Sequence, residues 1–529
     1  MVSLAVRMHC EAFWREPRAY LGALRWRVLR KRLRARAQFA ALLGRTSPAY
    51  SWWVLKQAPA QGDSPAGVPP IIALVAAAAD DAGVAETLAS LATEGVAAHI
   101  VGSDVAADLA RAGEELDWSA APWLLPMTAG DRLARGAAQA YRETMRAGDG
   151  VVIYADEDRL GSRGQRNFPH FKPDWNAELF RHHDYLTGAC VLRADRLALV
   201  RAGQTDDWAR TLVAGAVASG ARPMHVPQVL HHRRSMPLPA VPVAPLEPSA
   251  ELPGVSVIVP TRNRVDLLAT CIAGLEATGY PDIEVIVVDN DSDDPATLAF
   301  LDNLPSRNVA GFRIGVLHHP GPFNYSAINN RAVAAAGGDL VCLLNNDIEM
   351  LSPDWLSIMA TQALRDEVGA VGAQLLYPDG RIQHAGVVIG VGNAAGHAHR
   401  FLRPEEQGYF RRHALPQFVS AVTAACLVVR RDRFLAVGGL DEERFAVAFN
   451  DVDLCLRLNE KGWQSLYEPR AVLVHHESVS RGFDRDPVGA ARFAGELAAL
   501  QRRWQTDRIV DPFHHPYLSR ACEQFAVGL

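Results

Sequence analysis

The sequence predicts two successive α/β domains with mainly parallel central sheets, preceded by a basic helical segment. Strand-like apolar runs alternate with helix-like stretches on both sides of a proline-rich boundary. Three pairs of similar segments occur in the same order before and after that boundary, which indicates a duplicated fold. We therefore divide the chain into an N-terminal helical segment (1–60), a first domain (70–235), a linker (236–253) and a second domain with a C-terminal helical extension (254–529).

The composition is that of a soluble globular protein, with 49% hydrophobic and 21% charged residues. No apolar stretch reaches the ~18 residues that a membrane span needs, and the N-terminus lacks the apolar core of a secretory signal. Seven cysteines are scattered without a CxxC pair. This pattern favours reduced, buried thiols, Cys426 and Cys455 among them, over disulfides or a zinc cluster, so we expect a cytoplasmic protein.

The first sixty residues are strongly basic, with twelve Lys and Arg residues against two Glu, although the whole chain has a net charge of −5. Trp14 and Trp26 lie among the arginines. One interpretation is an amphipathic helix on the anionic inner face of the plasma membrane. The other is a helical hairpin packed on the next domain. A basic surface outside the folded domains argues against a nucleic-acid partner.

The elements of the first domain follow from apolar runs and helical periodicity. We expect strands at 71–75, 98–101 and 150–154, and helices at 81–95 and 130–147.

After the prolines of 236–253, which cannot join the interior of a sheet, the same alternation resumes. We expect strands at 255–259, 283–288, 314–318 and 340–344, and helices at 264–278, 294–304 and 325–337. The similar segments pair 148–158 with 337–349, 186–200 with 422–437, and 220–235 with 462–478.

Polar turns follow three strands of the second domain, at 260–263, 289–292 and 345–349. Ligands of parallel α/β sheets bind at the carboxyl ends of the strands. Carboxylates and amides gathered there suit a nucleoside diphosphate with Mg²⁺ or Mn²⁺. Neither a GxGxxG turn after the first strand nor a P-loop is present, which disfavours dinucleotide and P-loop sites.

Eight ordered motifs in 254–485 resemble the family 2 glycosyltransferases, and in particular rhamnosyltransferase-like members that build bacterial surface polysaccharide. They are VSVIVPTRN (255–263), VVDNDS (287–292), FNYSAINN (323–330), LLNNDIE (343–349), GRIQHAG (380–386), VGGLDEERF (437–445), FNDVDLCLRL (449–458) and HHESVSRG (475–482). The resemblance implies a GT-A fold, a nucleoside-diphosphate sugar donor, a divalent cation and inversion at the anomeric carbon. It also implies a glycan or lipid-linked saccharide acceptor.

The resemblance assigns roles to the polar turns. Asp289 would accept from the donor base, and Asn345 or Asn346 would face the ribose. Pro260, Thr261 and Asn263 would line the nucleotide, and Arg481 would reach the diphosphate. Asp291 stands where the family commonly has Gly.

The resemblance also makes Asp347 a metal ligand and Asp451 the catalytic base. His475 would complete the metal site, with His476 as its less favoured substitute. A sugar hydroxyl is a poor nucleophile, so a carboxylate must take its proton, and a metal offsets charge on the leaving diphosphate. Asp453, two residues after Asp451, cannot share its helix face and is expected to cap the helix or pair with an arginine.

Other interpretations stay open. Asn450 stands where the family frequently has Glu, which admits a catalytically silent carbohydrate- or nucleotide-binding scaffold. Nucleotidyl transfer is disfavoured because it would need a basic phosphate-binding loop near Pro260, and that stretch has only Arg262 and Arg264. The second copy has an extra segment that includes 381–415 and that we interpret as an acceptor-side insertion. Its histidines His384, His397 and His399 are expected to pack rather than bind metal.

The first domain is harder to interpret. Asp156 and Asp158 preserve a DxD pattern and mark a possible second site. Asp206 or Asp207 could replace the base, and His231 or His232 the late histidine. The first domain lacks a counterpart of the Pro-x-x-Asn turn at 260–263 and of the aspartate that follows Val287 and Val288 in the second domain. We therefore expect a degenerate copy rather than an active transferase.

Overall fold

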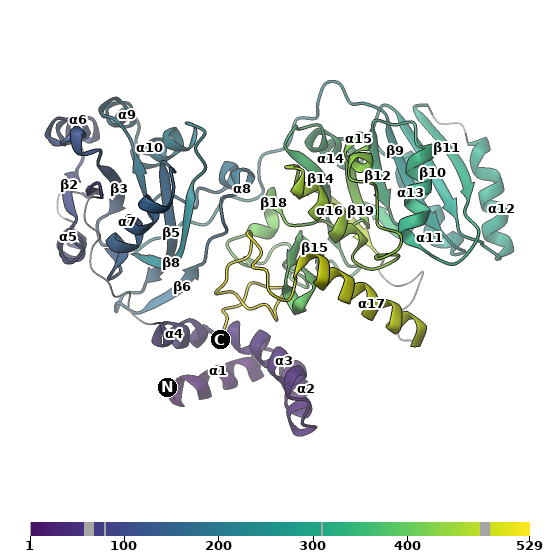
Figure 1. The fold of residues 1–529 in the computed structure, drawn as a ribbon, viewed down its shortest axis with the longest axis horizontal. Coiled ribbons are helices and arrows are strands. Elements are labelled where there is room, and N and C mark those ends of the chain that lie inside the picture. The colour runs from purple at the N-terminus through teal and green to yellow at the C-terminus, as the bar shows by residue number, and fades with distance from the viewer. Residues whose placement is uncertain (1, 58–67, 79–80, 308–309, 477–486) are drawn as a thin grey trace.

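The structure is a computed structural model and describes residues 2–57, 68–78, 81–307, 310–476 and 487–529. Two α/β units lie at opposite ends of the long axis, and the N-terminal helices and the C-terminus lie between them (Figure 1). We call residues 68–235 the first unit, 254–504 the second unit and 505–529 the C-terminal segment.

Four helices form the N-terminal part, where the sequence led us to expect one or two. They are α1 (Val2–Arg15), α2 (Pro17–Val28), α3 (Arg32–Gly44) and α4 (Ser47–Lys56). A small core of Ala12, Ala23, Ala35, Phe39 and Leu42 joins α1, α2 and α3. Helix α4 instead packs on the first unit, where the ring of Trp53 meets that of Phe171 at a centroid distance of 5.2 Å.

The first unit alternates strands and helices. Its strands are β1 (Ile71–Ala76), β2 (Ala97–Val101), β3 (Trp123–Thr128), β4 (Arg132–Leu133), β5 (Val152–Leu160), β6 (Arg166–His170), β7 (Cys190–Arg193) and β8 (Met224–Arg233). Its helices are α5 (Gly83–Thr93), α6 (Val105–Glu115), α7 (Ala137–Ala147), α8 (Ala177–His182), α9 (Arg196–Ala202) and α10 (Trp208–Val217). The 3-10 turn η1 (Trp118–Ala120) precedes β3.

The second unit has more elements. Its strands are β9 (Val255–Thr261), β10 (Ile283–Asp289), β11 (Phe312–His318), β12 (Leu340–Leu344), β13 (Ile348–Met350), β14 (Val368–Leu376), β15 (Ile382–His384), β16 (Val387–Ile389), β17 (Ala395–His397), β18 (Gln417–Val419), β19 (Cys426–Arg430) and β20 (Gln464–His475). Its helices are α11 (Val265–Glu276), α12 (Pro295–Asn303), α13 (Tyr325–Ala335), α14 (Trp355–Ala363), α15 (Arg431–Ala436), α16 (Asn450–Glu460) and α17 (Pro487–Trp504). Short 3-10 turns are η2 (Leu304–Ser306), η3 (Val391–Asn393) and η4 (Arg412–Ala414).

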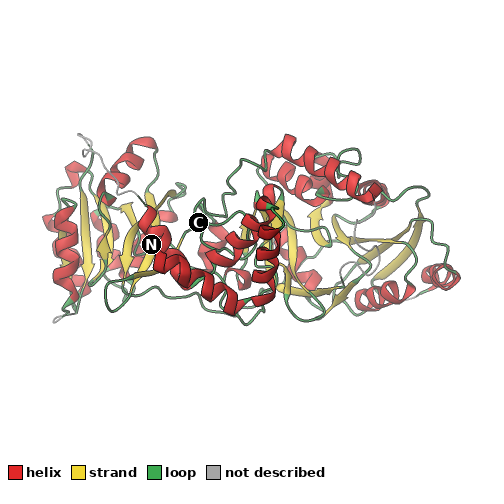
Figure 2. Ribbon diagram, turned by 90° about the horizontal axis from the view of Figure 1, so that it is seen from below, coloured by secondary structure: helices red, strands yellow, loops and turns green. Residues whose placement is uncertain are grey.

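The two main sheets share one strand order. The first sheet runs β2-β1-β3-β7-β5-β8-β4, and the second runs β10-β9-β12-β19-β14-β20-β13 with β11 added beyond β10. Neighbouring strands also pair in the same parallel or antiparallel sense in both sheets. Helices lie on both sides of each sheet (Figure 2), which explains why strands such as β9 are apolar along nearly their whole length.

Both sheets are mixed rather than mainly parallel, which corrects our expectation. Strand β7 of the first sheet and β19 of the second each run antiparallel to both of their neighbours. They separate two blocks of parallel strands.

This strand order also corrects one predicted repeat. The segment 148–158 contains β5, which lies between β7 and β8, whereas 337–349 contains β12, which lies between β9 and β19. The strand at the place of β12 in the first sheet is β3, which the sequence analysis did not predict. The other two repeats place β7 against β19 and β8 against β20, at matching positions in the two sheets.

The linker 236–253 forms neither helix nor strand and runs over both units. Val241 packs on the core of the first unit and Leu246 on that of the second. The C-terminal segment joins all parts of the chain: Val527 donates its N–H to Gly44 O (3.1 Å), and Asp174 of the first unit donates its N–H to Pro512 O (2.8 Å).

Candidate active site

The polar turns of the second unit meet at one edge of its sheet. Strands β9, β10, β12 and β20 end at this edge because they run in one direction, and β19 begins there because it runs in the other. Asp289 ends β10, Asp347 follows β12, and His475 ends β20. Five chain segments distant in sequence thus bring their polar residues together.

Asp289, Thr261 and Asn346 lie side by side in three adjacent turns. Thr261 pairs with Asp289 in register, and its hydroxyl accepts a hydrogen bond from the side-chain amide of Asn346 at 3.0 Å. All three are nearly buried. The Asp289 carboxylate accepts from the N–H of Ser292 at 3.2 Å and lies 3.3 Å from the exposed imidazole of His318. The carboxylate is therefore held near the surface at the end of β10.

Asn263 ties the first two turns together. Its side-chain oxygen accepts from the N–H groups of Asp293 and Asp294, both at 3.0 Å, and its amide donates to the Asp293 carboxylate at 2.7 Å. The residue adopts a left-handed conformation (φ 55°), which Asn tolerates better than most residues. Its side chain therefore shapes the turn.

Asp347 and His475 face each other across the strand ends. The Nε2 atom of His475 lies 3.1 Å from Oδ1 of Asp347 and 3.3 Å from the side-chain amide of Asn345. On the other side of the ring, Nδ1 lies 2.7 Å from the side-chain oxygen of Gln383. Because that oxygen can only accept, Nδ1 carries a proton, and the neutral ring turns its Nε2 lone pair toward Asp347.

This pair fits a divalent cation. Oδ1 of Asp347 is buried without a hydrogen-bond partner and faces a second lone pair at 3.1 Å. Adjacent ligands of an octahedral Mg²⁺, each ~2.1 Å from the ion, lie roughly 3 Å apart. Burial opposes ionisation of Asp347, but a protonated His475 lowers the pKa of the carboxyl by hydrogen bonding and charge. When the ring is neutral, a bound cation would supply that positive charge instead. Gln383 orients the imidazole as an outer partner does in metal sites.

Asp451 opens α16 at the same edge. Its Oδ2 accepts from the N–H of Ala424 at 3.1 Å, and Oδ1 accepts from the N–H of Val452 at 2.8 Å. Ala425, the next residue after Ala424, accepts from the N–H of Asn345 at 3.0 Å, so the start of β19 joins Asp451 to the turn of Asp347. Burial raises the pKa of Asp451 and outweighs the two backbone hydrogen bonds, which lower it. The carboxylate is therefore a stronger base than an exposed aspartate.

The neighbours of these residues have structural roles. The side chain of Asn450 is buried and donates to Val447 O at 3.0 Å. Asp453 pairs with Arg457 at 2.8 Å and accepts from Trp504 Nε1 at 2.9 Å, which confirms the expected arginine partner. His476 lies 3.1 Å from the Glu349 carboxylate, whereas His475 faces the carboxylate of Asp347.

The structure thus brings the predicted residues that it describes to one edge of the sheet. Arg481 lies outside the described residues. Gln383 lies within the motif GRIQHAG but was not among the predicted site residues, because its contact with His475 joins positions 92 residues apart.

Comparisons with known proteins find similarity in the same part of the chain. Residues 256–434 match the family described as Glycosyl transferase family 2. The matched region lies within the second unit. The chain is similar to the uncharacterized protein y4gI of Sinorhizobium fredii (39% identity over 72% of this chain and 46% of that protein) and to the O-antigen biosynthesis protein RfbC of Myxococcus xanthus (35% identity over 70% and 31%).

A shorter relative matches a smaller part of the chain. The N-acetylglucosaminyl-diphospho-decaprenol L-rhamnosyltransferase of Mycobacterium tuberculosis is 28% identical over 44% of this chain and 78% of that protein. The chain spans less than half the length of y4gI and about a third of RfbC. The names support glycosyltransferase chemistry and polysaccharide biosynthesis for this group of relatives.

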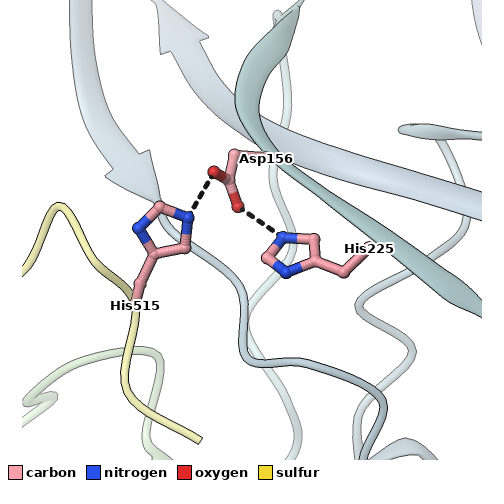
Figure 3. A group of neighbouring side chains, drawn as sticks. All are labelled: Asp156, His225 and His515. Atoms are coloured by element: carbon pink, nitrogen blue, oxygen red, sulfur yellow. Dashed lines mark hydrogen bonds and ion pairs between the residues drawn. The ribbon is translucent and has the colours of Figure 1, made fainter. Parts of the chain in front are cut away.

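Outside the region that matches the family, the first unit holds a second group of ionisable side chains. The carboxylate of Asp156 on β5 lies between two imidazoles, His225 from β8 and His515 from the C-terminal segment (Figure 3). One oxygen is 3.1 Å from His225 and the other 2.8 Å from His515. Asp156 and His515 are fully buried, and their possible ligand atoms, with that of His225, lie within 4.8 Å of one another.

Contacts within the protein account for this group without a metal ion, although Oδ2 of Asp156 and Nε2 of His515, 2.8 Å apart, miss hydrogen-bond geometry. The N–H of Tyr517 donates to Nδ1 of His515, so a neutral ring carries its proton on Nε2, the nitrogen that lies beside Asp156. His225 lies between two carboxylates, Asp156 and Asp174, and despite burial these partners raise its pKa. The group therefore links the C-terminal segment to the first unit.

Asp158 does not belong to this group. Its carboxylate is fully buried and contacts Tyr50 (2.5 Å), Arg166 (2.6 Å) and His232 (2.7 Å). The two aspartates of the predicted second DxD thus have different partners. Each side chain is committed to contacts within the fold.

The remaining predictions concern packing. His384 and His397 contact each other at 2.9 Å, and His399 stacks on Phe525. Among the described residues these histidines form no group of three possible metal ligands. The cysteines are free, and all except Cys10 are buried, as expected. No described helix is both long and apolar enough to cross a membrane.

Proposed function

We propose that the chain is an inverting, metal-dependent glycosyltransferase that moves a sugar from a nucleoside-diphosphate sugar to a hydroxyl of a saccharide acceptor. The observation that carries this proposal is the orphaned Oδ1 of Asp347, which faces Nε2 of His475 at 3.1 Å at the sheet edge where Asp451 is anchored. One side of the site thus offers ligands for a cation, and the other offers a base.

In this proposal, Asp451 accepts the proton of the attacking hydroxyl. The backbone N–H groups of Ala424 and Val452 hold its carboxylate in place, and burial keeps it basic. Asp347 and His475 would hold Mg²⁺ or Mn²⁺, which supplies charge stabilisation for the departing diphosphate. Gln383 keeps the imidazole of His475 turned toward Asp347.

The donor would lie across the turns that follow β9, β10 and β12. We assign the donor base to Asp289, the ribose to Asn345 or Asn346, and the diphosphate to Arg481. Pro260 and Thr261 would line the nucleotide at the end of β9. Asn263 acts on the nucleotide through the turn that its side chain organises.

We infer an acceptor that is a glycan or a lipid-linked saccharide, in the synthesis of a cell-surface polysaccharide. The names of two relatives, an O-antigen biosynthesis protein and a rhamnosyltransferase that acts on a diphospho-decaprenol carrier, support this inference. The sugar donor that we would test first is a nucleoside-diphosphate rhamnose.

We also propose that the first unit is a diverged copy of the same GT-A-like fold. The shared strand order supports this proposal. So do two positions: Asp131 directly precedes β4 as Asp347 precedes β13, and the two short strands pair at His232 and His475. Asp207, directly before α10, would then stand at the place of Asp451.

A contact of the N-terminal helices with anionic lipid is a further part of the proposal. Trp14 is 80% exposed, Val28 79% and Leu21 55%, and arginines surround them along α1 and α2. Tyr20 and Trp26 pack on the small core on the opposite side. An apolar stripe among cationic side chains is typical of a helix lying in a membrane surface.

The Asp451→Asn variant tests the reaction. We expect the rate of nucleoside-diphosphate release to fall by ~10²-fold or more, because general-base catalysis contributes about 10²–10⁴-fold. Donor binding, measured by thermal shift with Mn²⁺, should stay unchanged. Glu460→Gln, at the exposed end of the same helix, is the matched control. Normal turnover of Asp451→Asn would remove the mechanism, and binding without turnover in the unmodified protein would favour a silent scaffold.

A further inference from the structure

The first unit contains a cavity of about 290 Å³ at the carboxyl ends of its parallel strands. Ala76 of β1 and Thr128 of β3 border it, and Asp207 and Trp208 close it from the start of α10. Phe410 of the second unit also lines it. The cavity therefore occupies the edge of the first sheet that corresponds to the candidate active site in the second.

A guanidinium group takes the place of a metal ion at this edge. Arg233 lies 3.2 Å from Glu157 and 3.5 Å from Asp131, the carboxylate that directly precedes β4. Asp131 also accepts from the N–H of Arg234 at 2.8 Å. His232 is turned away and bonds Asp158. The carboxylate that matches Asp347 in position thus faces a fixed cationic side chain instead of an imidazole lone pair.

The charge of the lining disfavours an anionic ligand. Two arginines, Arg210 and Arg233, face three carboxylates, Glu157, Asp184 and Asp207. The lining histidines His170 and His183 add no positive charge at neutral pH, because burial lowers their pKa values to about 4 and about 3. Phosphate would therefore meet more negative than positive charge.

The end of β2 disfavours a nucleotide as well. Strand β2 ends in Val101, and Gly102 and Ser103 follow, whereas β10 ends in Asp289. Asp104 is used elsewhere, because its carboxylate caps α6 by accepting from the N–H of Ala107 at 3.1 Å. The volume is close to the lower limit of the ~300–1,000 Å³ typical of small-molecule sites. These features leave room for a single sugar residue.

The lining offers the contacts that an uncharged sugar needs. The indole of Trp208, only 5% exposed to solvent, provides an apolar wall for ring C–H groups. Carboxylates and arginines can accept from and donate to hydroxyls. Thr187 lines the same cavity, and its hydroxyl is buried without a hydrogen-bond partner among the described residues.

We propose that this cavity binds one uncharged sugar residue of a glycan, without a metal ion. Arg233, fixed by Glu157, and Asp207 at the rim contact the sugar hydroxyls, and Trp208 covers one face of the ring. The first unit is then a glycan-holding module beside the glycosyltransferase domain. The proposal rests on the cavity and does not require the second unit to be active.

Ligand-observed NMR on the full chain tests this proposal, with millimolar L-rhamnose, D-mannose, D-galactose and N-acetyl-D-glucosamine as probes. We expect saturation transfer to at least one sugar in the presence of EDTA. Asp207→Ala should weaken that binding about tenfold or more, since it removes hydrogen bonds to a charged group. Asp206→Ala, an exposed neighbour outside the cavity lining, is the matched control.

The outcomes separate this site from the candidate active site. Asp347→Ala should leave the sugar signal in EDTA intact while it weakens Mn²⁺-dependent donor binding. The proposal is overturned if no probe sugar binds, if Asp207→Ala binds as well as Asp206→Ala, or if inorganic phosphate displaces the sugar. Loss of the signal on chelation would also overturn it, because the site would then need a metal ion.

Discussion

Replacing Gln383 with Ala gives the sharpest test of the Asp347–His475 pair, because Gln383 is near no reacting group in the proposed mechanism. Its side-chain oxygen is 2.7 Å from Nδ1 of His475 and directs the opposite nitrogen to Asp347. Without it, the imidazole can rotate or change tautomer. Outer partners of metal-ligating histidines contribute about 10–100-fold to metal affinity, or ~1.4–2.7 kcal/mol.

The assay is a Mn²⁺ titration of donor binding and of nucleoside-diphosphate release at fixed donor concentration. We expect the half-saturating Mn²⁺ concentration of Gln383→Ala to rise by ~10–100-fold, with the maximal rate largely restored at high Mn²⁺. Gln407→Ala, exposed in the same insertion, is the control. An unchanged metal requirement with normal folding would refute the assignment of His475 as a metal ligand held by Gln383.

Three further predictions follow from other parts of the structure. Because burial raises the pKa of Asp451, we expect the acid limb of kcat/KM to lie above pH ~4, the ordinary Asp value; a limb at or below that value contradicts its role. Asp156→Asn should destabilise the fold by ~3–5 kcal/mol, since it removes the buried negative charge between the imidazoles of His225 and His515, with exposed Asp149→Asn as the control in urea unfolding. The double variant Leu21→Ser, Val28→Ser should lose cosedimentation with phosphatidylglycerol vesicles, and equal binding to neutral vesicles would contradict the electrostatic part.

The pH dependence of the Asp156 group has a definite sign. The pKa of Asp156 is lowered in the folded protein, because its imidazole partners outweigh burial, so its contribution to stability is lost as the pH falls toward that value. The pKa of His225 is raised, so its contribution is lost as the pH rises through the folded value. The difference in stability between the unmodified protein and Asp156→Asn should therefore be largest between pH ~4 and ~6.5.

The apolar strands were predictable because both faces of the sheets are covered by helices. Strands β9, β10 and β12 were predicted within two residues of their bounds, as their runs of Val, Ile and Leu contain no proline before position 260. Strand β3 was missed because Pro126 interrupts a short run. That omission left β5 as the apparent counterpart of β12, and it made Asp156 and Asp158 look like a second DxD turn.

The site was predictable where a motif ends a strand or opens a helix. Asp289 and His475 end strands, Asp347 lies in the turn after β12, and Asp451 lies at the start of α16. The two parallel blocks run in the same direction and bring these positions to one edge. The partner of His475 was not predictable in this way. Gln383 reaches it from β15, a short strand of an insertion whose path depends on tertiary packing and not on periodicity.

Each unit has a buried carboxylate at the same place in its sheet, and the group that faces this carboxylate differs between the two units. Asp131 directly precedes β4, which pairs with β8, and Asp347 directly precedes β13, which pairs with β20. Both carboxylates are buried. A buried carboxylate needs a positive partner or it takes up a proton. In the first unit the permanently charged Arg233 is that partner at 3.5 Å, although burial outweighs it and raises the pKa of Asp131. In the second unit the facing group is an imidazole lone pair, so the positive charge must come from a proton or from a bound metal ion. A dependence on divalent cations is therefore expected of the second unit alone.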